Sequence, residues 1–144
     1  MFFQPKAVTL IEMIIALAII AIVAFAITMS GGLASSQRLD CETRMLAADL
    51  RWARAMAVSK HNNYIIDFDL ANEIYMVYEN SVNPANLLKR QSLQVDIVSL
   101  SPAPNRITFN FPSGNSQAKQ IDLSYRAKTG RITIFGQTGY VKIQ

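Results

Sequence analysis

A single carboxylate stands at the start of a long apolar stretch near the N-terminus. Within residues 8–29 the only ionisable side chain is that of Glu12, and residues 13–27 are apolar without interruption. A carboxylate in such a stretch costs free energy in lipid unless it reaches water, a cation or a hydrogen-bond donor. Glu12 therefore either lies at the headgroup level of a membrane or meets a positive group from another chain. An N-terminal amine freed next to it by cleavage would be such a group.

The other residues that could do chemistry form no catalytic or metal-binding set. Cys41 is the only cysteine and His61 the only histidine, so neither an intrachain disulfide nor a His/Cys zinc site is predicted. His61 follows a predicted helix and suits the negative end of its dipole. Asp67 and Asp69 share one face of a predicted strand, which fits surface charge or a calcium contact. Without a Gly-x-Ser-x-Gly sequence or a phosphate-binding loop, we expect no catalytic residue, no cofactor, no metal and no enzyme activity.

The apolar stretch is long enough to cross a membrane. As a helix, the 22 residues 8–29 would extend about 33 Å, and a bilayer core is about 30 Å thick. We therefore predict a transmembrane helix. Two alternatives stay open, namely a secretory signal peptide cleaved after Ala34 and a plain signal anchor. The Lys and Arg residues on the two sides do not decide its orientation.

A second, amphipathic helix is predicted in residues 30–62. Its apolar face recurs at helical spacing and consists of Leu39, Leu46, Leu50, Ala53 and Ala57. We expect this helix to run from about Leu33 to Lys60 and to pack its apolar face on a sheet. Any bend before it should come from Ser30-Gly31-Gly32, since no proline interrupts the apolar helix.

Residues 63–144 carry the signals of an antiparallel β domain. Residues 64–68 alternate, which places Tyr64, Ile66 and Phe68 on one face. Residues 80–92 are predicted to be a loop. The expected strands are residues 64–68, 74–78, 93–100, 107–111, 121–126, 132–135 and 140–143. The predicted fold class is therefore α+β, with a long N-terminal helix, transmembrane and then amphipathic, packed on about seven antiparallel strands.

Charge is spread unevenly along the chain, whose formal net charge is +4. Residues 100–144 contain six basic residues and one acid, whereas residues 61–99 contain two basic residues and five acids. Such asymmetry fits the solvated faces of a small domain, an acidic partner, or head-to-tail orientation of neighbouring subunits. The basic C-terminal third would also suit the phosphates of a nucleic acid.

Residues 6–12 combine a basic residue, a small residue and a Thr-Leu-Ile-Glu sequence directly before the apolar stretch. They read Lys6-Ala7-Val8-Thr9-Leu10-Ile11-Glu12. This arrangement resembles the prepilin signal of type IV pilins, although Ala7 stands where that signal usually has glycine and Val8 where it has phenylalanine. The resemblance implies that residues 1–7 are a leader, that a prepilin peptidase cleaves between Ala7 and Val8, and that the new amine of Val8 is methylated. It also implies that Glu12 pairs with a neighbour's N-terminus during filament assembly.

Later stretches of the sequence point to one branch of the pilin class. They are the helical residues Leu46, Leu50-Arg51, Ala53-Arg54 and Ala57, the turn Phe109-Asn110-Phe111-Pro112-Ser113-Gly114, and the closing stretches Gly130-Arg131-Ile132-Thr133-Ile134 and Gly139-Tyr140-Val141-Lys142. These resemble the helix, turn and closing hairpin of the GspH/FimT family. With the N-terminal signal, the resemblance covers nearly the whole chain and implies a pilin-like fold.

The resemblance implies a minor pseudopilin of a type II secretion system, anchored in the inner membrane by one helix with its C-terminal domain in the periplasm. The implied partners are other pilin or pseudopilin subunits, the prepilin peptidase and the inner-membrane assembly platform. One alternative is a FimT-like minor type IV pilin in pilus assembly or DNA uptake, with Arg131 and Lys142 contacting nucleic acid. Some FimT-like members carry a Gly-Arg-x-Arg tail, of which residues 139–142 keep one basic residue. The other alternative is a signal-anchored periplasmic binding domain.

Overall fold

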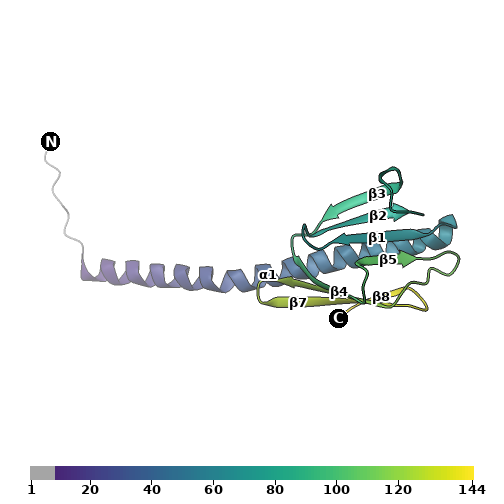
Figure 1. Ribbon diagram of the computed structural model, residues 1–144. Coiled ribbons are helices and arrows are strands. Elements are labelled where there is room, and N and C mark those ends of the chain that lie inside the picture. Colours follow the sequence, from purple (N-terminus) through teal and green to yellow (C-terminus); the bar gives the residue numbers. More distant parts are fainter. Residues whose placement is uncertain (1–8) are drawn as a thin grey trace. The chain divides into compact units, whose positions relative to one another are not determined.

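The computed structural model describes residues 9–144, with side chains described for residues 9–25 and 35–144. In that part of the chain, the elements are one long α-helix, a short 3-10 helix and eight β-strands. The chain divides into one unit of Met1–Ala34 and another of Ser35–Gln144, and each is described by itself. Figure 1 shows the elements coloured in chain order.

Helix α1, Leu10–Lys60, begins behind a threonine cap. The backbone N–H of Glu12 donates to the carbonyl oxygen of Thr9 at 3.1 Å and to its Oγ1 at 3.4 Å. A threonine in this position supplies acceptors to N–H groups that the first helical turn leaves unpaired. Glu12 lies three residues after the cap, where the positive end of the helix dipole favours a carboxylate. Thr9 and Glu12, which belong to the stretch that resembles a prepilin signal, therefore also start the helix.

The predicted end of the helix is confirmed. Helix α1 ends at Lys60, and His61 follows in the left-handed region with a φ of 59°. Helices often end in this conformation, because it turns the chain out of the helical path. The His61 ring packs edge-on against Phe111, with 4.7 Å between ring centroids. Residues 30–32, the place predicted for any bend, lie within α1.

Two four-stranded antiparallel sheets form the rest of the fold (Figure 1). The first has the strand order β3-β2-β1-β5 and the second the order β4-β6-β7-β8. The strands of the first sheet are β1 (Tyr64–Asp69), β2 (Ile74–Glu79), β3 (Leu87–Ser92) and β5 (Arg106–Phe109). Those of the second are β4 (Asp96–Ser101), β6 (Lys119–Tyr125), β7 (Lys128–Phe135) and β8 (Tyr140–Ile143). The short helix η1 (Pro84–Asn86) precedes β3. The predicted α+β class is confirmed.

One predicted loop is wrong in its second half. Residues 80–92 contain strand β3, which pairs with β2 at the edge of the first sheet. Only Lys89 and Gln91 of this strand are half-buried, and its other residues are exposed. Because no apolar residue of β3 alternates into the core, the hydrophobic pattern carries no signal for a strand there. The strand predicted for residues 93–100 is β4, which begins at Asp96.

The apolar face predicted for the later part of α1 is buried. Its members Leu39, Leu46, Leu50, Ala53 and Ala57 are each at most 6% exposed. They share one core with residues from both sheets, including Tyr64, Ile66 and Phe68, whose predicted alternation is also confirmed. Leu46 has no exposed surface, and truncating such a leucine to alanine usually costs about 2–5 kcal/mol. This core fixes the later part of α1 on the two sheets.

Candidate functional site

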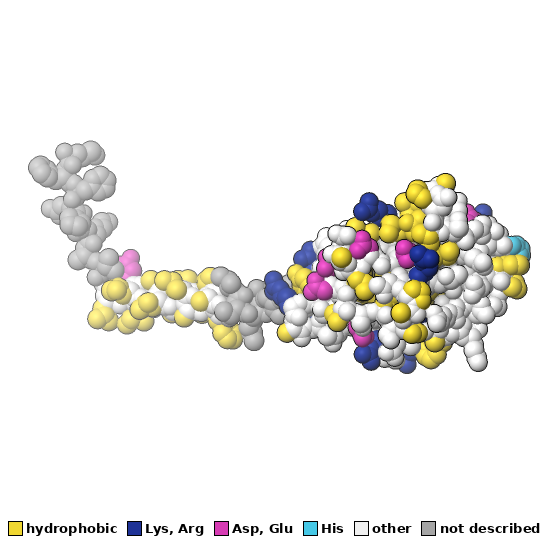
Figure 2. Space-filling model, in the orientation of Figure 1, with side chains coloured by type: hydrophobic (Ala, Val, Ile, Leu, Met, Phe, Trp, Pro, Cys, Tyr) yellow, Lys and Arg dark blue, Asp and Glu magenta, His cyan; other side chains and the backbone are white. Residues whose placement is uncertain are grey.

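The first described stretch of α1 exposes a continuous set of apolar side chains. All side chains of residues 10–25 are exposed. The large apolar ones, each at least 51% exposed, are Leu10, Ile11, Met13, Ile14, Ile15, Leu17, Ile19, Ile20, Ile22, Val23 and Phe25. Figure 2 shows apolar side chains along this part of the helix. Exposed apolar surface of this extent marks a contact with lipid or with other protein chains.

Glu12 is the only acid of that stretch. Its side chain is exposed and makes no hydrogen bond or ion pair with any residue that the structure describes. Ala7 and Val8, the predicted cleavage and methylation residues, lie outside the described residues, as does part of the membrane segment predicted at residues 8–29. Across the described residues, no helix reaches the length and hydropathy of a membrane span.

Two arginines of α1 tie the helix to the last hairpin. Nε of Arg54 donates to the carbonyl oxygen of Thr138 at 2.8 Å, and Nη2 of Arg51 donates to that of Val141 at 3.0 Å. Thr138 lies in the turn between β7 and β8, and Val141 belongs to β8. Because β8 is an edge strand, its outward carbonyl needs a donor from outside the sheet. Arg51 and Arg54, in the helix stretch that resembles the GspH/FimT family, therefore supply donors to backbone carbonyls of the closing hairpin.

Two glycines with positive φ meet beside Arg54. Gly114 has a φ of +65° and Gly139 a φ of +64°, in the region where a residue without Cβ is favoured. A Cβ on Gly139 would lie 2.0 Å from the carbonyl oxygen of Gly114, and one on Gly114 would lie 2.9 Å from Cγ2 of Val58. Each would also lie within 3.2 Å of a side-chain carbon of Arg54. The helix, the turn and the closing hairpin that resemble the GspH/FimT family thus meet where Arg54, Gly114 and Gly139 come together.

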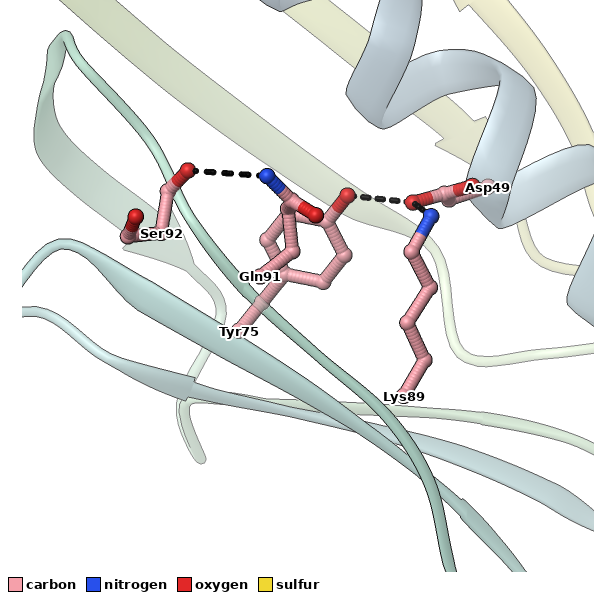
Figure 3. Close-up of polar contacts among 5 residues, drawn as sticks. All are labelled: Asp49, Tyr75, Lys89, Gln91 and Ser92. Atoms are coloured by element: carbon pink, nitrogen blue, oxygen red, sulfur yellow. Dashed lines mark hydrogen bonds and ion pairs between the residues drawn. The ribbon is translucent and has the colours of Figure 1, made fainter.

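A polar cluster joins α1 to β2 and β3, as Figure 3 shows. The Tyr75 hydroxyl donates to Asp49, and Nζ of Lys89 lies 2.6 Å from the same carboxylate oxygen. Tyr75 has no exposed surface, whereas the Lys89 side chain is 38% exposed. Burial, together with the Asp49 carboxylate, raises the pKa of Tyr75 well above its usual range, so the hydroxyl stays protonated and donates. Next to the cluster, Nε2 of Gln91 donates to the carbonyl oxygen of Ser92 at 3.3 Å.

Asp67 and Asp69 both have partners inside the domain. Oδ1 of Asp67 accepts from Nε of Arg106 at 3.0 Å. Asp69 accepts from the backbone N–H groups of Ala71 and Asn72 and from Nδ2 of Asn72, and this last hydrogen bond lowers the pKa of Asp69. The two carboxylates therefore fix a strand pair and a turn. No group of three or more His, Cys, Asp or Glu side chains arranged for a metal occurs among the described residues.

Two of the basic residues in the C-terminal third are used inside the domain. Arg106 pairs with Asp67, as described above. Lys119 is 2% exposed, and its Nζ donates to the carbonyl oxygens of Pro102 and Pro104. Burial lowers the pKa of Lys119. These two cations therefore hold strands and a loop together rather than facing a partner.

Arg131 and Lys142, the residues predicted for the nucleic-acid alternative, lie on the same face of the second sheet. Lys142 is opposite Thr133 in the pairing of β7 with β8, and Arg131 precedes Thr133 by two residues. Nε of Arg131 lies 2.6 Å from Oδ1 of Asp122, and this hydrogen bond lowers the pKa of Asp122. Arg131 is therefore in an ion pair, whereas Lys142 forms none with the described residues. This face offers a phosphate group less free positive charge than the sequence suggests.

Family models match both parts of the chain. Residues 42–139 match the model described as type II transport protein GspH, which is more than half of the chain. The chain belongs to the GspH family. Residues 4–28 match the model of the prokaryotic N-terminal methylation motif, which confirms the predicted prepilin-type signal. Among proteins with a curated function, none matches the sequence.

Two solved structures share the fold of this GspH family protein. The type IV minor pilin FimU of Pseudomonas aeruginosa (strain PAO1) matches 76% of this chain and 90% of its own, with a TM-score of 0.63 at 17% identity. The minor pseudopilin EpsH from the type 2 secretion system of Vibrio cholerae matches 74% of this chain and 96% of its own, with a TM-score of 0.58 at 12% identity. The pilin-like fold of this GspH family protein is confirmed.

The structure contains a contact between Asp49 and Tyr75 that the sequence patterns leave undetected. Asp49 lies within the matched stretch and follows Leu46 by three residues, so it falls on the buried face of the helix. An acid on an apolar helix face indicates a buried hydrogen-bond or ion-pair partner, and this much can be predicted from the sequence alone. The partner itself, Tyr75, lies 26 residues away, and no spacing rule indicates it.

Proposed function

We propose that this GspH family protein is a minor pseudopilin of a type II secretion system, assembled through its N-terminal helix into a periplasmic pseudopilus that supports protein secretion. The observation that carries the proposal is the exposed apolar surface of residues 10–25 in a chain with a GspH head. This surface begins with the carboxylate of Glu12, which has no partner among the residues that the structure describes. A soluble protein rarely exposes such a surface without a lipid or protein partner. The helix therefore serves first as an anchor and then as the assembly element.

The proposed order of events starts with processing. A prepilin peptidase cleaves between Ala7 and Val8 and methylates the amine of Val8. The subunit then waits in the inner membrane with its C-terminal domain in the periplasm, until the assembly platform moves it into the filament beside other pseudopilins. The match of residues 4–28 to the N-terminal methylation motif supports this order. Cleavage creates a positive amine four residues before Glu12 in every copy.

Glu12 supplies a driving force that the apolar side chains lack. Lipid already solvates those side chains, so moving them from lipid to a helix bundle gains little from the hydrophobic effect. An ionised side chain inside a bilayer costs up to about 3 kcal/mol on insertion scales. The terminal amine of a neighbouring copy offsets part of that cost in the filament. The cap at Thr9 uses only the backbone N–H of Glu12, so none of the residues that the structure describes occupies the carboxylate.

Substitution of Glu12 tests this step. Glu12→Ala should leave membrane insertion intact and lower the filament-incorporated fraction by about tenfold, which corresponds to roughly 1.4 kcal/mol of lost assembly energy. The fraction is measured by immunoblotting sheared filaments and membranes from cells that express the full chain. Glu12→Asp keeps the charge and should retain part of the incorporation. Asp96→Ala, which removes an exposed acid of the head, is the matched control. Normal incorporation of Glu12→Ala would contradict the role.

The choice of machine is tested separately by deleting the gene. We expect secreted proteins to accumulate in the periplasm, with surface pili and DNA uptake unchanged, and secretion to return with the wild-type gene. Loss of pili or of DNA uptake with normal secretion would instead assign the protein to a type IV pilus. If secretion, pili and DNA uptake all stay normal and the chain keeps its leader, the result would favour a signal-anchored binding domain.

A further inference from the structure

Two arginines share one tyrosine ring at the turn between β6 and β7. Nη1 of Arg38, on α1, donates to the Tyr125 hydroxyl at 3.2 Å, and its Cζ lies 5.5 Å from the ring centroid. Cζ of Arg126 lies 5.6 Å from the same centroid. Arg38 also donates to Oε1 of Gln94. Both arginines are exposed while Tyr125 packs against the core, so these contacts hold two guanidinium groups at one surface.

Arg126 occupies a backbone position that favours glycine. Its φ is 55°, and it is one of two residues between Tyr125 and Lys128, which pair across the hairpin. Two-residue hairpins usually place Gly, Asn or Asp where φ is positive. An arginine at such a position is conformationally unfavourable, and unfavourable backbone geometry gathers at functional positions. The hairpin therefore presents the Arg126 cation at its tip although the positive φ there is unfavourable for arginine. The exposed Lys128 adds a second cation.

No acid neutralises these cations within the described residues. The ion pairs there involve neither Arg38, Arg126 nor Lys128. Asp40 lines the same surface depression as Lys128, but its carboxylate pairs with Arg44 at 2.8 Å. Three positive charges therefore lie together at this end of the head domain.

Asp96, on the neighbouring strand β4, faces away from the tyrosine. It pairs with Ser124, the residue before Tyr125, and the alternation of strands puts Ser124 and Tyr125 on opposite faces. The hydrogen bond from Arg38, helped by the charges of Arg38 and Arg126, lowers the pKa of Tyr125. Both observations agree with a locally positive surface.

The sequence puts this surface a short length of chain after the predicted membrane segment. Arg38 follows Met29, the last residue of that segment, by nine residues. Nine residues extend about 14 Å as a helix and at most roughly 32 Å when fully stretched. By chain length alone, Arg38 is within reach of the headgroup layer of a membrane that holds residues 8–29.

We propose that Arg38, Tyr125, Arg126 and Lys128 form a docking surface, the basic hairpin patch, for anionic phospholipid headgroups of the membrane that holds the unassembled subunit. This rests on the membrane anchoring in the proposed function. Guanidinium groups bind phosphate oxygens through paired hydrogen bonds, and tyrosine favours the membrane–water interface. Each basic residue near an anionic surface strengthens binding about fivefold. Docking holds the head at the membrane until the subunit is lifted into the filament.

Cys41 provides a reporter beside the basic hairpin patch. It is the only cysteine, is exposed, and follows Arg38 by about one helical turn. The full chain, spin-labelled at Cys41, is inserted into nanodiscs of phosphatidylcholine alone or of an equal mixture with phosphatidylglycerol. A nickel chelate attached to lipid headgroups relaxes the label when the head lies at the surface. We expect stronger relaxation on the anionic discs and a loss of this difference at high salt.

Charge removal gives the quantitative test. Arg38→Gln combined with Arg126→Gly should lower the ratio of docked to free heads on anionic discs by about 25-fold. Glycine suits the φ of residue 126, so that substitution preserves the fold. Lys128→Gln alone, which removes no hydrogen bond between described residues, should lower the ratio by about fivefold. Lys60→Gln combined with Arg90→Gln removes two exposed cations elsewhere and should behave as wild type.

The outcomes separate this proposal from the proposed function. Equal relaxation on neutral and anionic discs, in a chain that co-elutes with both, would overturn the docking surface and leave the secretion role standing. The docking surface would fall equally if the control variant lost as much relaxation as the patch variants. A chain that does not enter the discs would overturn membrane anchoring and the docking surface together.

Discussion

Replacing Gly139 with alanine should destabilise the head domain strongly. Gly139 lies in the turn between β7 and β8, and its φ of +64° is unfavourable for alanine. The added Cβ would lie 2.0 Å from the carbonyl oxygen of Gly114, so the two turns must separate by about 1 Å to reach a 3.0 Å contact. The side chain of Arg54 packs beside both glycines and holds the hairpin to α1, so such a shift also disturbs the hydrogen bond from Arg54 to Thr138.

The size of the effect follows from two costs. Alanine in the left-handed region costs roughly 1–2 kcal/mol relative to glycine. Forcing extra volume into a packed site costs about 1–3 kcal/mol more. The free energy of unfolding should therefore fall by about 2–5 kcal/mol. For a unit the size of Ser35–Gln144, this lowers Tm by about 8–20 °C.

Thermal unfolding of the full chain in detergent measures the change. Trp52 is the only tryptophan, and it packs edge-on against Tyr64 with 6.0 Å between ring centroids. Its fluorescence and near-UV circular dichroism therefore report the contact between α1 and the first sheet. The matched control is Gly130→Ala on β7, where the nearest atom to the new Cβ is Oγ1 of Thr43 at 3.1 Å and φ is not positive. The control should lose less than about 1 kcal/mol. Equal Tm values for Gly139→Ala and Gly130→Ala would refute the claim that Gly139 packs tightly against Gly114 and Arg54.

Two further predictions concern polar contacts of the head. Asp49→Ala leaves the buried Tyr75 hydroxyl without its acceptor and should cost about 1–3 kcal/mol in urea unfolding, whereas Lys89→Ala at the partly exposed end of the cluster should cost less than about 1 kcal/mol. Arg131 lowers the pKa of Asp122 from its ordinary value of 3.8, so the ionised carboxylate stabilises the fold above that value and this stabilisation is lost as the pH falls through the folded-state pKa. Between about pH 5 and pH 3, wild type should therefore lose more stability than Asp122→Asn.

Each of these predictions has an outcome that would contradict it. A larger loss from Lys89→Ala than from Asp49→Ala would mean that the ion pair, rather than the tyrosine hydrogen bond, holds the cluster. Parallel stability curves for wild type and Asp122→Asn across the acid range would mean that the pair of Asp122 with Arg131 contributes nothing to folding.

Hydrophobic periodicity predicted the parts of the fold that bury apolar surface. The five apolar positions from Leu39 to Ala57 are all buried, and α1 ends at Lys60 as expected. The same reasoning failed for β3, because this edge strand turns no apolar residue into the core. Its pairing with β2 comes from backbone hydrogen bonds, which leave no trace in the side-chain pattern.

The candidate sites depend on contacts between residues far apart in the sequence, and these were harder to predict. Glu12 stood out because a lone carboxylate in an apolar stretch is unusual whatever the fold. Arg38 contacts the Tyr125 ring that Arg126 also contacts, although Arg38 lies 87 positions before Tyr125 and 88 positions before Arg126 in the sequence. The pairing of Arg131 with Asp122 also depends on the register of β6 with β7, so the charge count alone overstated the cations open to a partner.

The most direct test of the pilin-type role is the intact mass and N-terminal residue of the protein, purified from cells with and without a prepilin peptidase. We predict a chain that has lost residues 1–7 and begins with a methylated Val8, and only when the peptidase is present. A chain that still begins at Met1 in both strains, or one that begins at Ser35, would contradict assembly through a processed N-terminal helix.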